Sequence, residues 1–158
     1  MDAVTYPNAK VIDFLQDKVI PLQLTSNAKP ESDDYNVKWT PHLAILDADG
    51  KEHHKIVGFL PAPEFIAAVL LGVGKAAFGF DKFDEAIANF DQTINEYAYT
   101  SSAPEAVFFR AVCLYKSTHQ PGHLRDAYEK LQVEYHCSEW AQRAFPYWLI
   151  PPTVPAGT

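Results

Sequence analysis

The sequence is poor in cysteine, in basic residues and in long apolar runs, and each shortage argues against a class of protein. Its 158 residues contain two cysteines, Cys113 and Cys137, fewer than a small disulfide-held secreted domain usually has. Only 13 Lys and Arg stand against 20 Asp and Glu, so the basic surface of a nucleic-acid binder is missing. No apolar run has the length of a membrane span, and no signal peptide follows Met1. We therefore expect a cytoplasmic protein without nucleic-acid or membrane partners, unless a signal precedes Met1.

Motifs for catalysis and metal binding are also missing. No Ser-His-Asp order, phosphate loop or zinc-binding spacing occurs. His119 and His123 have helical spacing, but a Pro-Gly pair interrupts any helix between them. His53 and His54 are adjacent and should point to opposite faces of a strand. The segment 47–50, Asp-Ala-Asp-Gly, lacks the later acidic ligands of a calcium loop. We predict no catalytic residue, no metal site and no cofactor.

The first third of the chain has the pattern of a short helix and several strands. Asn8 is placed to cap a helix over residues 9–18. Short apolar runs predict three strands, over residues 19–24, 42–47 and 54–59. Asp49-Gly50 between the last two is a strong hairpin signal. The polar stretch 25–38 should be a loop.

From Pro63 onward the apolar period changes from that of strands to that of helices. The expected helices cover about 63–78, 81–97, the segment from 104 to the loop at 119–123, 124–135 and 139–145. The first is apolar almost all round between Phe65 and Leu71, which predicts burial on most sides and packing against both halves of the protein. The pairs Ala86–Phe90 and Ala127–Leu131 form a weak internal repeat.

Two families are recognisable in these motifs. Trp39-Thr40-Pro41, the following strand, its Asp-x-Asp-Gly turn and Lys55-Ile56-Val57-Gly58 resemble the second half of a thioredoxin. In that family the Thr-Pro bond is cis and its proline faces the redox cysteines. Where the family has a small residue this chain has Trp39, which implies a partly filled groove beside the proline.

The helical part is similar to tetratricopeptide repeats. Gly74, Ala86 and Phe90 match three signature positions of that repeat. The joint arrangement resembles bacterial thioredoxin-family proteins in which the last thioredoxin helix continues into repeat helices. The resemblance implies that the strand and the Cys-x-x-Cys that precede this segment in the family are missing here.

The expected fold is α/β followed by all-α: a truncated thioredoxin-like sheet of about three strands and then antiparallel helical hairpins of the tetratricopeptide type. We assign residues 1–78 to the thioredoxin-like part and 63–148 to the helical domain, with the helix at 63–78 shared. Residues 149–158 are expected to be a flexible tail, because they are rich in proline.

Dithiol exchange requires a thiolate with a resolving cysteine close by, and no Cys-x-x-Cys occurs. Cys113 lies on an apolar helical stripe, which favours packing, and Cys137 follows a helix end beside His136. We therefore predict a non-catalytic protein-interaction module. The alternative is the downstream part of a thiol–disulfide oxidoreductase whose Cys-x-x-Cys lies upstream of Met1.

The candidate binding residues fall in two groups. Trp39, Thr40 and Pro41 are candidates for binding an extended peptide by backbone pairing, although a purely structural turn explains them too. Trp140 and Trp148 are candidates for an exposed contact surface near the C-terminus. The expected partner is a protein or peptide, and an exposed sheet edge favours a homodimer.

Overall fold

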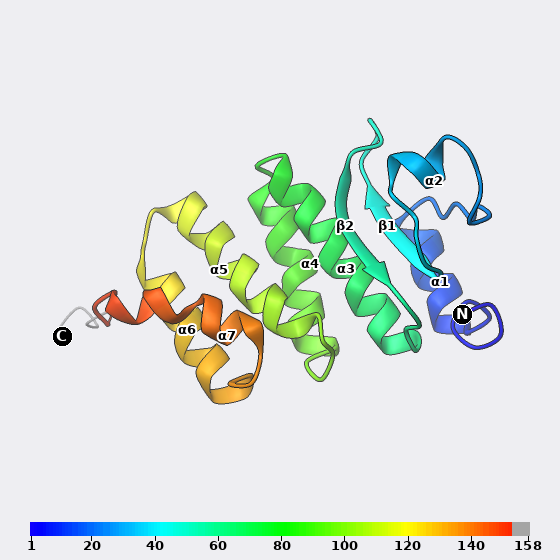
Figure 1. The fold of residues 1–158 in the computed structure, drawn as a ribbon. Helices are drawn as coiled ribbons and strands as arrows, with labels where there is room; N and C mark the ends of the chain where they lie inside the picture. The colour runs from blue at the N-terminus through cyan, green and yellow to red at the C-terminus, as the bar shows by residue number, and fades with distance from the viewer. Residues whose placement is uncertain (153–158) are drawn as a thin grey trace.

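The computed structural model describes residues 1–152 and shows a small sheet with helices around it, followed by a row of helices (Figure 1). Its elements are α1 (Ala9–Lys18), α2 (Glu31–Asp34), β1 (His42–Leu46), β2 (Glu52–Val57), α3 (Ala62–Gly79), α4 (Phe83–Glu96), α5 (Ala103–Thr118), α6 (Gly122–Glu134), α7 (Glu139–Arg143) and the 3-10 helix η1 (Phe145–Leu149). A mixed front part and an all-helical back part are thus confirmed.

β1 and β2 form the expected antiparallel hairpin. His42 lies opposite Val57 and Ile45 opposite His54, with an irregular register between Ile45 and Leu46. Gly50 closes the turn with a φ of 81°, a left-handed conformation that glycine adopts without strain. The returning strand begins and ends two residues earlier than predicted, at Glu52 and Val57 instead of 54 and 59.

The strand expected over residues 19–24 does not form, so the sheet of the described residues has two strands instead of about three. This segment has no regular structure, and its apolar side chains point outward: Ile20 is 98% and Leu22 79% exposed. A strand is stable only where a neighbour pairs with it, and Pro21 lacks one of the donors that pairing needs. The apolar run alone was therefore a misleading signal.

α3 is the central helix of the protein. On one side it contacts α1, β1 and β2, and on the other α4 and α5. Its segment from Phe65 to Leu71 is buried throughout, so the helix does pack against both halves. By length and composition alone α3 would also suit a membrane span, although its longest unbroken apolar run is short. More than half of it is buried inside the protein, as in a core helix.

The helices after α3 pack in sequence order, each against the next. Ala86 and Phe90 are fully buried in one cluster of this half, and Ala127 and Leu131 are buried in the next. The fifth expected helix, over 139–145, is divided between α7 and η1. Of the expected tail, residues 153–158 lie outside the described residues.

Candidate interaction surface

The sheet has a covered face and an outer face. Side chains alternate along a strand, and Ile45 and His54 point at α3, because a Cβ placed on Gly72 would meet both. His42 and Ala44 of β1 and Val57 of β2 therefore point to the outer face.

Three large apolar side chains are exposed at or just beyond the strand ends where His42 pairs with Val57. Trp39 is 70%, Val57 50% and Phe59 55% exposed, and together we call them the Trp39 patch. The carbonyl oxygen of Pro41 accepts a hydrogen bond of 2.8 Å from the Gly58 amide, which holds the two segments that carry the patch side by side. Thr40 is exposed, Pro41 is half-buried and the bond between them is cis. The candidate residues 39–41 thus lie at the surface.

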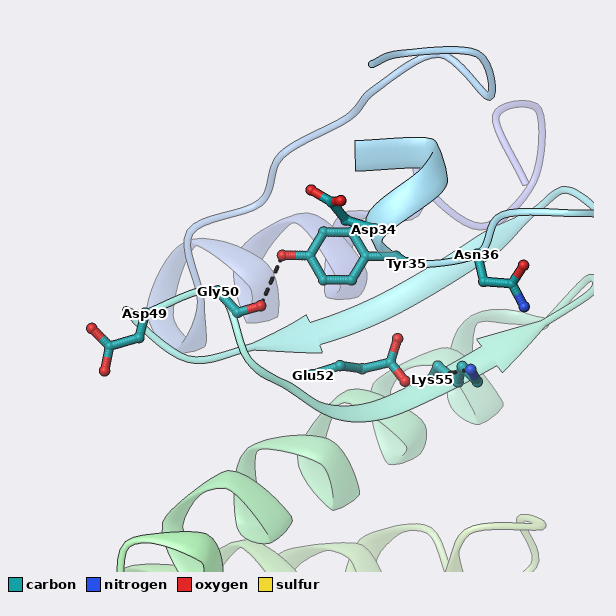
Figure 2. Close-up of a pocket in the computed structure, with 7 residues that line it drawn as sticks. All are labelled: Asp34, Tyr35, Asn36, Asp49, Gly50, Glu52 and Lys55. Atoms are coloured by element: carbon teal, nitrogen blue, oxygen red, sulfur yellow. Dashed lines mark hydrogen bonds and ion pairs between the residues drawn. The ribbon is translucent and has the colours of Figure 1, made fainter. Parts of the chain in front are cut away.

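A polar hollow lies at the other end of the outer face, on the side of the hairpin away from α3 (Figure 2). It is lined by Asp34, Tyr35, Asn36, Asp49, Gly50, Glu52 and Lys55. The Tyr35 hydroxyl donates a 2.8 Å hydrogen bond to the Gly50 carbonyl and so ties the segment after α2 to the hairpin turn. The hollow is open and mostly polar, unlike the enclosed apolar pockets that bind small molecules.

The free edge of β1 carries backbone groups without partners. The Pro41 carbonyl points to β2, because it accepts a hydrogen bond from the Gly58 amide. Backbone groups alternate in direction along a strand, so those of Leu43 and Ile45 also point to β2. Those of His42, Ala44 and Leu46 point away from it. Among the described residues, no further backbone hydrogen bond is formed by these three. No strand within residues 1–152 pairs with this edge of β1.

His42 is a second unpaired group at this edge. Both of its ring nitrogens are buried and have no hydrogen-bond partner among the described residues. Leaving a buried polar group unpaired costs about 1–3 kcal/mol, so this histidine lowers the stability of the hairpin as it stands. The sequence analysis missed His42, because an isolated histidine at a strand start carries no signal of its burial.

Trp140 and Trp148 lie near the other end of the protein, on α7 and η1, far from the Trp39 patch (Figure 1). Trp140 is partly buried against Phe108, with ring centroids 5.1 Å apart. Trp148 is half exposed. The Arg125 guanidinium lies 4.3 Å from the Trp148 ring centroid and donates hydrogen bonds to the Trp148 and Ile150 carbonyls at 2.6 and 2.9 Å. The structure does not bring the two groups of candidate residues together.

The two thiols are free and differ in environment. Cys113 is fully buried, and this burial raises the pKa of its thiol to about 11. Cys137 is exposed. A buried thiol with such a pKa is protonated near neutral pH and is a poor nucleophile. Within residues 1–152, no group of three or more His, Cys, Asp or Glu side chains is placed to hold a metal ion.

A polar network joins the sheet to the helical half. The Lys75 ammonium lies 2.8 Å from a Glu105 carboxylate oxygen and 3.3 Å from His54 Nδ1. It also lies 5.4 Å from the centroid of the Phe109 ring. Burial, and then the charge of Lys75, lower the pKa of His54 to about 4. Sequence analysis missed this network because its members come from β2, α3 and α5.

Comparison with known families agrees with the sheet geometry. Residues 3–71 match the sequence model of the family described as Thioredoxin-like domain. A thioredoxin-like domain is therefore present, and it extends from the N-terminal turn into α3. Comparisons with curated proteins and with solved structures give no match. The family match ends inside α3, so the likeness of the later helices to tetratricopeptide repeats stays a prediction.

Proposed function

We propose that this protein is a non-catalytic protein-interaction module that joins a thioredoxin-like part to helices of the tetratricopeptide type. The observation that carries the proposal is the free edge of β1, where His42, Ala44 and Leu46 turn unpaired backbone groups away from β2. An extended segment of a partner adds to such an edge through main-chain hydrogen bonds, and pockets or patches beside the edge supply selectivity.

The Trp39 patch supports the same function. Trp39 precedes the first residue of β1 by three positions, and Val57 lies opposite that first residue on β2. Tryptophan is enriched among the residues that dominate binding energies. The partner is accordingly a protein or peptide in extended conformation, and we place the encounter in a bacterial cytoplasm.

The test is selection of peptides from a displayed library on the purified protein, followed by mapping of the bound site from backbone amide shifts. Binders should shift the amides of residues 42–46 and the indole signal of Trp39. Trp39→Ala should weaken binding about tenfold or more, as expected for a central aromatic contact. Trp148→Ala, at the other end of the protein, is the matched control and should leave binding unchanged. Selected peptides that shift only signals of α6, α7 and η1 would overturn the assignment.

The thioredoxin-like match also favours a second candidate function. The chain would then be the downstream part of a thiol–disulfide oxidoreductase, with its Cys-x-x-Cys encoded upstream of Met1. The genomic sequence distinguishes the two: an in-frame Cys-x-x-Cys shortly before Met1 supports the oxidoreductase, and its absence supports the interaction module.

A further inference from the structure

The row of helices ends in an exposed apolar surface. Phe145 and Trp148 of η1 are 62% and 50% exposed, and the following Leu149 is 82% exposed. Residues three apart in a 3-10 helix lie on the same side of it, and both aromatic rings lie against Tyr128 of α6, at centroid distances of 6.4 and 6.0 Å. We call these four residues the η1 patch. Stacked helical arrays end in a layer with a polar outer face, so this apolar end indicates a contact surface.

The η1 patch is held in place by contacts on its inner side. The buried Arg125 guanidinium lies against the Trp148 ring and donates hydrogen bonds to the Trp148 and Ile150 carbonyls. The Tyr147 ring stacks on Phe108 of α5, with centroids 5.7 Å apart. A surface that is ordered before binding loses little conformational entropy when it binds. The η1 patch is therefore preorganised for contact.

The charged side chains beside the η1 patch are balanced, although the whole chain has a net charge of −7. Arg125 pairs with Glu129 at 2.7 Å on α6, and Arg143 pairs with Glu139 at 2.9 Å on α7, the helix that leads into η1. Two molecules of the same net charge repel each other, so copies of this chain associate most readily through a surface whose own charges cancel. In a two-fold contact, Arg143 of one copy can also pair with the second copy's Glu139.

We propose that the η1 patch is the interface between two copies of this chain, which meet at their C-terminal ends about a two-fold axis. Symmetric dimers of this kind are the commonest homo-oligomers. Each exposed large side chain contributes roughly 100 Å², so the patch supplies about 300–400 Å² of apolar core per copy. The balanced ion pairs form the polar rim, and together they approach the roughly 500 Å² per copy that a specific interface needs.

This inference goes beyond the proposed function, because it uses a different surface. The sheet lies at the opposite end of the molecule from η1 (Figure 1). Two copies joined at their C-terminal ends would therefore carry their thioredoxin-like parts at the outer ends of the dimer. Linking two binding sites in this way raises the avidity for a partner that presents two copies of its binding segment.

The test introduces a charge into the η1 patch. In light scattering at micromolar concentration, the wild-type chain should have about twice the monomer mass of 17.7 kDa. Phe145→Glu and Leu149→Glu should each lower the mass to that of the monomer and weaken association about tenfold or more, because an unpaired charge is costly in an apolar interface. Circular dichroism checks that each variant is folded. The matched control is Ile20→Glu, at a 98% exposed side chain in the segment after α1, which should stay dimeric.

A shortened chain that ends at Pro152 tests a different occupant of the η1 patch, the chain's own residues 153–158, which lie outside the described residues. The shortened chain should keep the dimer mass of the wild type. Association that appears only after this removal would assign the patch to the chain's own end and overturn the homodimer.

Two further results would overturn the homodimer. One is a wild-type monomer throughout the micromolar range, and the other is folded Phe145→Glu and Leu149→Glu variants that keep the dimer mass. The proposed function fails independently, when selected peptides bind away from residues 42–46. A wild-type monomer whose peptides map to 42–46 therefore removes the homodimer alone.

Discussion

Gly72 and Gly74 lie on opposite faces of α3, one against the sheet and the other against α4. A Cβ on Gly72 would lie 2.4 Å from Ile45 Cγ1, and one on Gly74 would lie 2.5 Å from Phe90 Cε1. Residues two positions apart in an α-helix point in directions about 200° apart. A single turn of α3 therefore approaches both halves of the protein closely. The absence of two side chains allows both approaches.

Alanine at either glycine should destabilise the protein. Alanine favours a helix over glycine by up to about 1 kcal/mol, but each new methyl group would overlap a packed side chain, and overpacking costs about 1–3 kcal/mol. We expect Gly72→Ala and Gly74→Ala each to lower the free energy of unfolding in urea titrations. The control is Ala88→Gly on the exposed side of α4. It should lower the free energy of unfolding through the loss of helix propensity alone, because no packing changes there. Unchanged or raised stability in both alanine variants would contradict the close packing.

Leu70→Ala tests whether α3 unites the two halves in one folding unit. Leu70 is fully buried, and truncating such a leucine costs about 2–5 kcal/mol. We expect one cooperative transition, shifted as a whole, when tryptophan fluorescence and far-ultraviolet circular dichroism follow the same urea titration. Val133→Ala, at a side chain that is 80% exposed, should change little. Two separate transitions, of which Leu70→Ala moves only one, would show that the halves unfold independently.

The thiols should be unequal in reactivity, and the chain should not reduce disulfides. Burial raises the pKa of Cys113 to about 11, whereas Cys137 is exposed, so a thiol reagent at pH 8 should label one site rapidly in the folded protein. Cys137→Ser should abolish this rapid labelling.

In an insulin-reduction assay with dithiothreitol, the rate should equal that without protein. An acceleration that disappears when Cys113 and Cys137 are replaced would refute the absence of dithiol chemistry.

The polar network around Lys75 should make stability depend on pH. The pKa of His54 falls from 6.5 to about 4 in the folded protein, through burial first and the Lys75 charge second. The unfolded chain therefore binds a proton at higher pH than the folded one, and the stability contributed by the neutral ring is complete above about pH 6.5 and lost as the pH falls toward 4. One such group changes the free energy of unfolding by at most about 1.4 kcal/mol per pH unit.

Urea titrations between pH 7 and pH 4 measure this dependence. His54→Gln should flatten the curve over that window, whatever its effect on stability at pH 7. The Asp47 carboxylate, which accepts a hydrogen bond from His53, titrates lower still, because that bond and the Lys51 amide hold its pKa below 3.8. Its stabilising effect is lost only as the pH falls below that value. An equally steep curve in His54→Gln would show that another group causes the dependence.

Local signals in the sequence predicted the elements that depend on neighbouring residues. The Asn8 side chain accepts a hydrogen bond from the Lys10 amide and caps α1, as expected. Asp49-Gly50 forms the hairpin turn, and the all-round apolar character of α3 corresponds to its burial on both sides. In each case the determining contacts are a few residues apart, or they follow from the composition of one helix.

Only the tertiary structure decided the features that need distant partners. Residues 19–24 have the pattern of a strand, but no strand pairs with them among the described residues. A backbone hydrogen bond between Gly58 and Pro41 holds together the two segments that carry the Trp39 patch. Trp140 and Trp148 lie far from this patch because several helices intervene. Strand pairing, edge exposure and the pairing of buried polar groups such as His42 and His54 depend on which segments meet in space, and an amino-acid pattern along one segment does not contain that information.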